Sequence, residues 1–155
     1  MGGRRNQRGL TLIELIVAFT IMALLTSMAV PLARYKVRRD KERQLVYALR
    51  EIRKAIDDYK DAALAGKIEI KLGTEGYPET LDKLVEGVKL LQDAEGKKIK
   101  FLRRIPLDPM TNSREWNLRS MQDDPKSQSW GRENVFDVYT KSTDRARDGT
   151  AYAEW

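Results

Sequence analysis

The feature that most constrains this chain is an apolar run from Leu10 to Leu32 that contains one charged side chain, Glu14. A helix of that length, at about 1.5 Å per residue, would span the roughly 30 Å hydrocarbon core of a bilayer. A carboxylate inside such a segment costs about 2.5–3.5 kcal/mol on insertion scales, so a chain that keeps one is expected to use it. We therefore predict a membrane-spanning helix over residues 10–33 and a role for Glu14.

Two ordinary explanations compete with this interpretation. A secretory signal peptide has a basic start, an apolar core of about 7–15 residues and a small-residue cleavage site. Arginines before the run and the string Ser27-Met28-Ala29 fit that description, but the run is longer and contains an acid. A plain membrane anchor fits the length and leaves Glu14 without a purpose.

The string Gly9-Leu10-Thr11-Leu12-Ile13-Glu14-Leu15 resembles the class III leader of type IV pilins and type II secretion pseudopilins. The resemblance implies that a prepilin peptidase removes residues 1–9 by cutting between Gly9 and Leu10, and then N-methylates Leu10. The family usually has Phe after the cut, so Leu10 is a departure. The resemblance further implies that Glu14 pairs with the terminal amine of a neighbouring subunit as a filament grows. Such pairing would offset the cost of each charge in lipid.

Pro31 lies late in the apolar run. A proline removes one helical hydrogen bond and clashes with the preceding turn, so it either kinks the helix or ends it. The residues alone leave both outcomes open. The resemblance favours a helix that continues past Pro31, and we include this residue with Glu14 among those expected to matter for filament assembly.

The composition excludes several classes of chemistry. The 155 residues include neither cysteine nor histidine, which rules out disulfides, thiolate metal sites, histidine-ligated zinc and Ser-His catalysis. The net charge is +6, and removal of the leader with Arg4, Arg5 and Arg8 leaves +3. A nucleic-acid module would interleave aromatic residues with its basic ones. The few tyrosines near the basic helix do not form such a platform, so we expect no nucleic-acid partner and no enzyme activity.

The basic residues also conflict with a simple topology rule. Positive charge normally marks the cytoplasmic flank of a membrane span. Here three arginines precede the span, and six basic residues follow it: Arg34, Lys36, Arg38, Arg39, Lys41 and Arg43. The resemblance nevertheless places the leader in the cytoplasm and residues 34–155 in the periplasm, as an amphipathic helix followed by an α+β domain.

Helical periodicity resumes after Pro31. Apolar residues recur at steps of three and four, which predicts one continuous helix from about Leu10 to Ala65 that ends at Gly66. This apolar stripe comprises Leu45, Leu49, Ile52, Ile56, Tyr59 and Ala63. Residues 67–72 alternate, with Ile68, Ile70 and Leu72 on one side, and predict a brief strand or an extended loop. A short helix at 81–85, strands at 116–121 and 135–139, and a loop at 123–131 follow.

Further strings extend the resemblance into the second half of the chain. Tyr77-Pro78, Ile105-Pro106-Leu107-Asp108-Pro109 and Phe136-Asp137-Val138-Tyr139 occur in the order found in the major pseudopilin of type II secretion. In that family a C-terminal loop binds calcium through carboxylates and carbonyls. Here the loop offers Asp144 and Asp148, with Glu154 further on, while Ala151-Tyr152 replaces the usual acidic pair. Calcium takes six to eight oxygens, so this set favours plain turn carboxylates over a calcium site.

The sequence therefore predicts an α+β, type IV pilin-like fold in which a long N-terminal helix packs on a small antiparallel sheet. The function we expect is structural: a pseudopilin, major rather than minor, of a type II secretion system. Its expected partners are further copies of itself, other pseudopilins, the prepilin peptidase and an inner-membrane assembly platform. A type IV pilin for adhesion, twitching or DNA uptake is the alternative. The absence of cysteines and the C-terminal pattern favour secretion.

Overall fold

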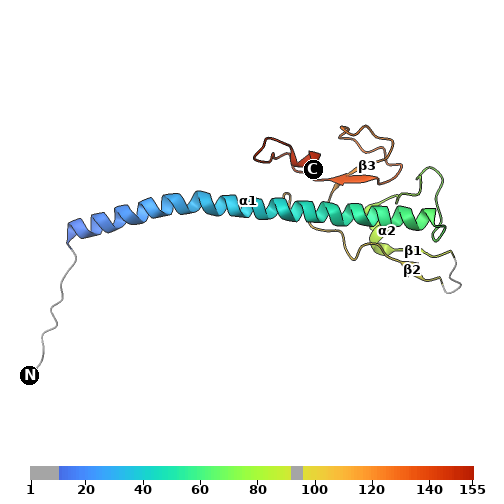
Figure 1. Cartoon of the computed structure of the whole chain (residues 1–155), viewed down its shortest axis with the longest axis horizontal. Coiled ribbons are helices and arrows are strands. Elements are labelled where there is room, and N and C mark those ends of the chain that lie inside the picture. Colours follow the sequence, from blue (N-terminus) through green and yellow to red (C-terminus); the bar gives the residue numbers. More distant parts are fainter. Residues whose placement is uncertain (1–10, 92–95) are drawn as a thin grey trace, which may run out of the picture. The chain divides into compact units, whose positions relative to one another are not determined.

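The computed structural model describes residues 11–91 and 96–155, and gives only the backbone of residues 28–32. Its elements are α1 (Leu12–Leu64), α2 (Leu81–Glu86), β1 (Val88–Lys89), β2 (Lys98–Ile99), β3 (Asn117–Arg119), β4 (Asp137–Tyr139) and a 3-10 turn, η1 (Tyr152–Glu154) (Figure 1). The chain divides into two compact units, Met1–Asp40 and Lys41–Trp155. A long N-terminal helix with small antiparallel sheets confirms the predicted α+β, type IV pilin-like fold.

The predicted continuous helix is confirmed within two residues at each end. α1 has 53 residues, and its helical backbone continues through position 31, so Pro31 does not end it. α1 ends at Leu64, and Gly66 just beyond it has a φ of 67°, which suits glycine. There Gly66 N–H donates to the Ala63 carbonyl and Lys67 N–H to the Ala62 carbonyl, both at 3.0 Å. This pair of bonds is a Schellman motif, which satisfies carbonyls that the helix end would otherwise leave unpaired.

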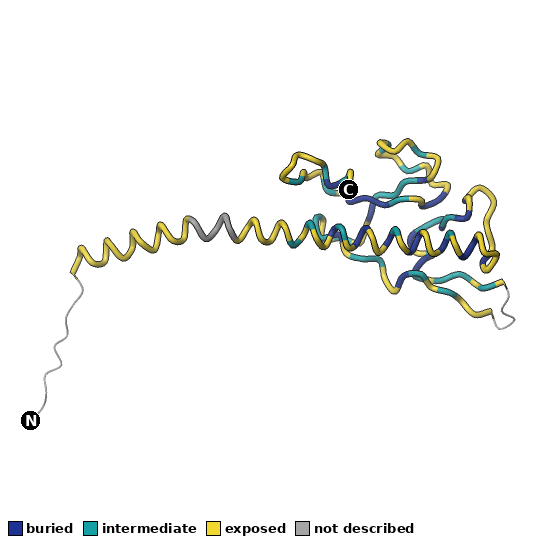
Figure 2. The backbone as a smooth tube through the Cα atoms, in the orientation of Figure 1, coloured by how far each residue is buried: buried dark blue, intermediate teal, exposed yellow. Residues whose placement is uncertain are grey.

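The core of unit Lys41–Trp155 forms around the apolar stripe of α1. Every residue of the predicted stripe is buried, and Leu45, Ile52 and Ile56 are fully so. Figure 2 shows the buried positions recurring along this half of the helix. The stripe packs against side chains from the rest of the unit: Ile68, Leu81, Leu84, Leu102, Trp116, Val135, Val138 and Tyr152. Burial of this face therefore fixes α1 as the scaffold of the unit.

The two predicted strands pair with each other but are shorter than expected. β3 and β4 are antiparallel, with Leu118 opposite Val138. Residues 123–131 between them form a loop, as predicted. A second antiparallel pair, β1 and β2, was not predicted, because two residues per strand are too few to show alternation. The predicted short helix is confirmed as α2, which ends at Gly87.

Of the two alternatives predicted for residues 67–72, a brief strand or an extended loop, the structure has the loop, and the three apolar side chains do not share one buried face. No strand forms in this described segment; Ile68 is buried, whereas Ile70 is half exposed and Leu72 fully exposed. The chain turns soon afterwards, because Thr74 N–H donates to the Lys71 carbonyl. Without a paired strand there is no ladder to hold alternate side chains on one face.

The sequence predicted a membrane span over residues 10–33. Across residues 11–91 and 96–155, no helix is both long enough and apolar enough to cross a membrane. Leu10 and the side chains of residues 28–32 lie outside the described part of the predicted span.

Candidate functional site

The first turn of α1 holds Glu14 in a capping box. Thr11 N–H and Thr11 Oγ1 both donate to Glu14 Oε2, each at 2.8 Å, and Glu14 N–H lies 3.4 Å from Thr11 Oγ1. Reciprocal bonds of this kind satisfy backbone donors that a helix start otherwise leaves unpaired. The carboxylate is also placed at the positive end of the helix dipole. The predicted position of Glu14 in the first helical turn is therefore confirmed.

This capping box was missed in the sequence, although its signal was there. The pattern Thr11-x-x-Glu14 ahead of an apolar run is a helix-start signature. The box matters chemically because the Glu14 side chain is exposed at the helix start, where a cation from another molecule can reach it. Gly9 and Leu10, the predicted cleavage and methylation positions, lie outside the described residues.

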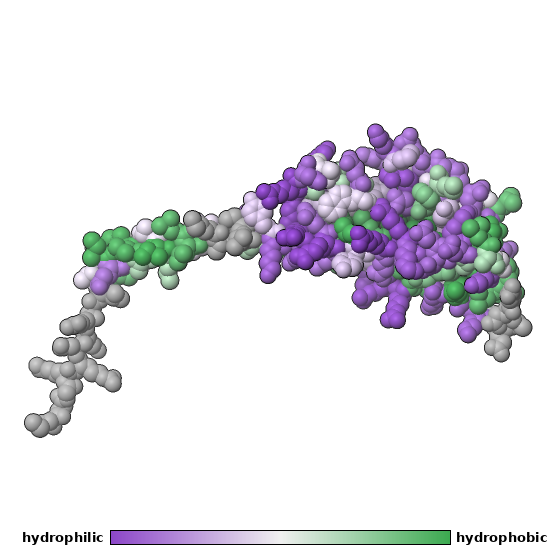
Figure 3. All heavy atoms as spheres, viewed as in Figure 1, coloured by the Kyte–Doolittle hydropathy of each residue, from purple (hydrophilic) through white to green (hydrophobic). Residues whose placement is uncertain are grey.

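The side chains after the cap form an exposed apolar surface, the apolar segment, over residues 12–27. Its large members are all more than half exposed: Leu12, Ile13, Leu15, Ile16, Val17, Phe19, Ile21, Met22, Leu24 and Leu25. Figure 3 shows this continuous hydrophobic surface along the first part of α1. Apolar patches of this extent mark membrane or protein interaction sites.

The hydroxyl side chains of the apolar segment donate hydrogen bonds to carbonyls of the same helix. Thr20 Oγ1 donates to the Ile16 carbonyl, Thr26 Oγ1 to the Met22 carbonyl, and Ser27 Oγ to the Leu24 carbonyl, each at 2.8 Å. These hydroxyl protons are thus satisfied without water. The segment is therefore suited to an apolar environment, since the hydroxyls bring no unmet donor into it.

Two further predicted features lie just beyond the apolar segment. The Pro31 side chain is outside the described residues, so its role in assembly stays a prediction. The basic residues from Arg34 to Arg43 are exposed, and Arg38 and Arg43 have partners of their own.

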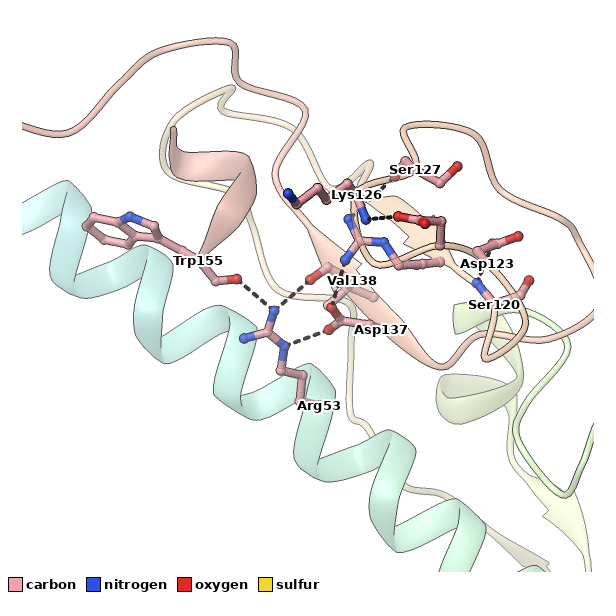
Figure 4. Close-up of polar contacts among 10 residues, drawn as sticks. Arg53, Ser120, Asp123, Lys126, Ser127, Asp137, Val138 and Trp155 are labelled. Carbon is pink, nitrogen blue, oxygen red and sulfur yellow. Dashed lines mark hydrogen bonds and ion pairs between the residues drawn. The ribbon is translucent and has the colours of Figure 1, made fainter. Parts of the chain in front are cut away.

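A second group of polar contacts joins the C-terminal segment to α1. Arg53 Nε donates to Asp137 Oδ1 at 2.7 Å, and Arg53 Nη2 donates to the carbonyls of Val138 at 3.2 Å and Trp155 at 2.7 Å (Figure 4). Tyr152 Oη donates to Glu42 Oε1 at 2.7 Å. Arg53 thus joins the helix, β4 and the chain near Trp155. Sequence reasoning missed it, because its partners are more than 80 residues away.

Several acidic side chains have hydrogen-bond or ion-pair partners in the loops and on α1. Asp123 Oδ2 accepts hydrogen bonds from Ser120 N–H at 2.7 Å and Gly131 N–H at 3.0 Å. These bonds lower the pKa of Asp123, with the Ser120 amide the larger cause. Asp124 accepts from Lys126 N–H, and Asp58 pairs with Lys54. Each of these carboxylates therefore has a structural partner.

Asp144 and Asp148, the residues considered as possible calcium ligands, lie in an exposed C-terminal loop. Asp148 Oδ1 accepts hydrogen bonds from Thr150 Oγ1 at 2.7 Å and Thr150 N–H at 3.0 Å, which lower the pKa of Asp148. Asp144 N–H donates to Ser142 Oγ at 3.2 Å. Within residues 11–91 and 96–155, no three acidic side chains gather as a metal site would require. The structure therefore does not bring Asp144, Asp148 and Glu154 together.

Comparison with protein families gives a match at the N-terminal end of the chain, over the start of α1. Residues 4–30 match the prokaryotic N-terminal methylation motif. The match supports a type IV pilin-like protein. This motif implies processing by a prepilin peptidase, anchoring through the N-terminal helix and assembly into a filament. No curated protein and no solved structure matches the chain.

Proposed function

We propose that this pilin-like protein is the major pseudopilin of a type II secretion system. The observation that carries the proposal is the methylation motif, with Glu14 held by Thr11 at the exposed start of α1. In this proposal the subunit resides in the bacterial inner membrane as a single-pass protein with its C-terminal domain in the periplasm. It polymerises into a periplasmic pseudopilus that pushes folded proteins across the outer membrane.

Assembly would begin with removal of residues 1–9 and methylation of the new amino terminus at Leu10. The resulting ammonium lies four residues before Glu14, and a charge left alone in an apolar environment is costly. Pairing of Glu14 with the amine of a neighbouring subunit would offset that cost and set the axial register. The exposed apolar segments of successive copies would then pack against one another, with the assembly platform and other pseudopilins as further partners.

The choice of secretion over a surface pilus rests on weaker features. The chain has no cysteine, whereas many type IV pilins close a C-terminal loop with a disulfide. The strings around Tyr77, Asp108 and Phe136 follow the order of the major pseudopilin. A type IV pilin for adhesion, twitching or DNA uptake remains the second candidate, because the same leader serves both kinds of filament.

The decisive experiment compares a strain that lacks this protein with its parent. Proteins in the culture medium are measured by mass spectrometry, and surface fibres are imaged on the same cells. Loss of secreted proteins with normal surface fibres is expected. Intact secretion with missing fibres would move the protein to the type IV pilins. The deletion strain carrying the unaltered gene on a plasmid serves as the control.

A further inference from the structure

The C-terminal loop, residues 142–152, is closed by its own backbone. Ala146 N–H donates to the Thr150 carbonyl at 2.7 Å, and Gly149 N–H donates to the Ala146 carbonyl at 3.1 Å. Arg145 and Ala151 form an isolated antiparallel bridge at the base of this turn. The loop is therefore a small closed turn.

A cationic side chain lies across this turn. Arg145 Nη1 donates to the Gly149 carbonyl at 2.9 Å, so the guanidinium links the two arms of the loop. A guanidinium carries a fixed positive charge and several donors in a rigid plane. Here it places a positive charge on the Gly149 carbonyl, an oxygen of the kind that a bound cation would otherwise contact.

The loop ends at residues that fasten it to α1. Tyr152 N–H donates to the Asp144 carbonyl at 3.2 Å, and the Tyr152 ring is buried and meets Trp155 edge-on, with ring centroids 5.0 Å apart. Trp155 Nε1 also donates to Thr150 Oγ1 at 3.2 Å. Because Tyr152 and Trp155 contact Glu42 and Arg53, the shape of the loop affects where these anchors meet the helix.

The donors of this loop do not fit calcium. Calcium takes six to eight oxygen ligands, usually including several carboxylate oxygens. Asp148 Oδ1 already accepts hydrogen bonds from Thr150, and the Gly149 carbonyl already accepts one from the Arg145 guanidinium. Arg145 and Arg147 also add positive charge, which repels a divalent cation.

We propose that Arg145 closes the C-terminal loop in place of a metal ion, so that the loop keeps its shape without calcium. Arg145 is then a positioning residue for Tyr152 and Trp155. This inference is independent of whether the filament serves secretion or forms a surface pilus, because it concerns the loop of a single subunit.

The test is amide hydrogen exchange of the full-length protein in detergent, read by mass spectrometry on peptides that cover residues 142–155. Exchange of the wild type should be the same in EDTA and in millimolar calcium chloride. Arg145→Gln should exchange about tenfold faster in this segment, because it loses a charge-assisted hydrogen bond across the turn. Arg147→Gln is the matched control, since Arg147 is an exposed arginine of the same loop, and it should exchange like the wild type.

Two outcomes would overturn the proposal. One is slower exchange of the wild-type segment on addition of calcium, and the other is wild-type exchange in Arg145→Gln. Peptides from the buried stripe of α1 report whether each variant is folded. If Arg145→Gln does not fold, Arg145→Lys, which keeps the charge but not the planar guanidinium, reads the role of Arg145, and the wild-type comparison with and without calcium still tests whether calcium shapes the loop.

Discussion

Glu14 has two separable tasks at the scale of a single residue. Within one subunit its carboxylate caps α1 through Thr11. Between subunits the carboxylate is proposed to form an ion pair with the terminal ammonium of a neighbour. Caps are worth about 1 kcal/mol, whereas loss of one partner from a buried ion pair costs several times more. The proposed contact between subunits is therefore the larger effect.

We predict that Glu14→Ala is inserted into the membrane normally but gives at least about tenfold less filament, because the neighbour's amine loses its buried partner. Sheared filaments and membrane fractions are quantified by immunoblot. Thr11→Val is the matched control, because it removes the hydroxyl of the capping box and keeps the carboxylate, and its filament yield should fall much less. Normal filament yield from Glu14→Ala would refute the role.

Arg53 on α1 donates hydrogen bonds to three residues that are distant in sequence: Asp137, Val138 and Trp155. We predict that Arg53→Gln lowers the free energy of unfolding by about 1–2 kcal/mol, because two carbonyls lose their charged donor and Asp137 keeps only the longer contact with Arg119, at 3.5 Å. Partial exposure of the guanidinium keeps the effect from being larger. Urea unfolding measures the change. Arg50→Gln, an exposed neighbour on α1, should cost little, and equal losses in both variants would contradict this account.

Asp123 makes the loop between β3 and β4 sensitive to acid. Its folded-state pKa is below the usual value of 3.8, so its stabilising effect is complete above about pH 5. The effect is lost as the pH falls through the lowered folded pKa. We therefore predict that the wild type melts higher than Asp123→Asn at pH 6 and that the difference shrinks below pH 4. A difference that grows toward acid pH would have the wrong sign.

Among the elements, α1 has two different halves, one exposed and one packed in the core. Its apolar segment is exposed, whereas its second half buries the stripe around Leu49. We predict that Leu49→Ala lowers the free energy of unfolding by about 2–5 kcal/mol, because it leaves a cavity in the core. Tyr47→Ala removes a larger but exposed ring from the same turn and should change stability by less than about 0.5 kcal/mol. Thermal melting compares the two, and similar costs would show that the stripe does not form the core.

The elements also show what the sequence could predict. α1, its buried stripe and its end at Gly66 follow from the 3.6-residue period and a glycine at a helix end, which are local signals. The Arg53 contacts were out of reach, because they depend on which distant segments the fold brings together. The capping box at Thr11 was readable but overlooked. The roles of Pro31 and of the residues at the cut stay predictions.

At the scale of the whole molecule, the two units depend on different surroundings. Unit Lys41–Trp155 has its own core, whereas the described side chains of residues 11–27 are exposed. Isolated helices are marginal in water, but an apolar helix is stabilised by a micelle. We predict that heating the protein in detergent unfolds Lys41–Trp155 cooperatively and leaves residual helical circular dichroism.

Leu49→Ala is the control for that experiment. It should lower the temperature of the main transition and leave the residual helical signal unchanged, because Leu49 lies outside the apolar segment. Complete loss of helical signal in a single transition would show that the two units unfold together.

The contacts of Tyr152 and Trp155 with α1 also bear on the order in which contacts form during synthesis. Glu42 and Arg53 leave the ribosome about a hundred residues before their partners do. During that interval the residues of α1 have been made, but side chains that cover its buried stripe, such as Tyr152, have not. Contacts so distant along the chain form late, because closing a long loop costs entropy. Interruption of translation shortly before Tyr152 would therefore leave a chain that carries the N-terminal methylation motif but lacks these contacts in unit Lys41–Trp155.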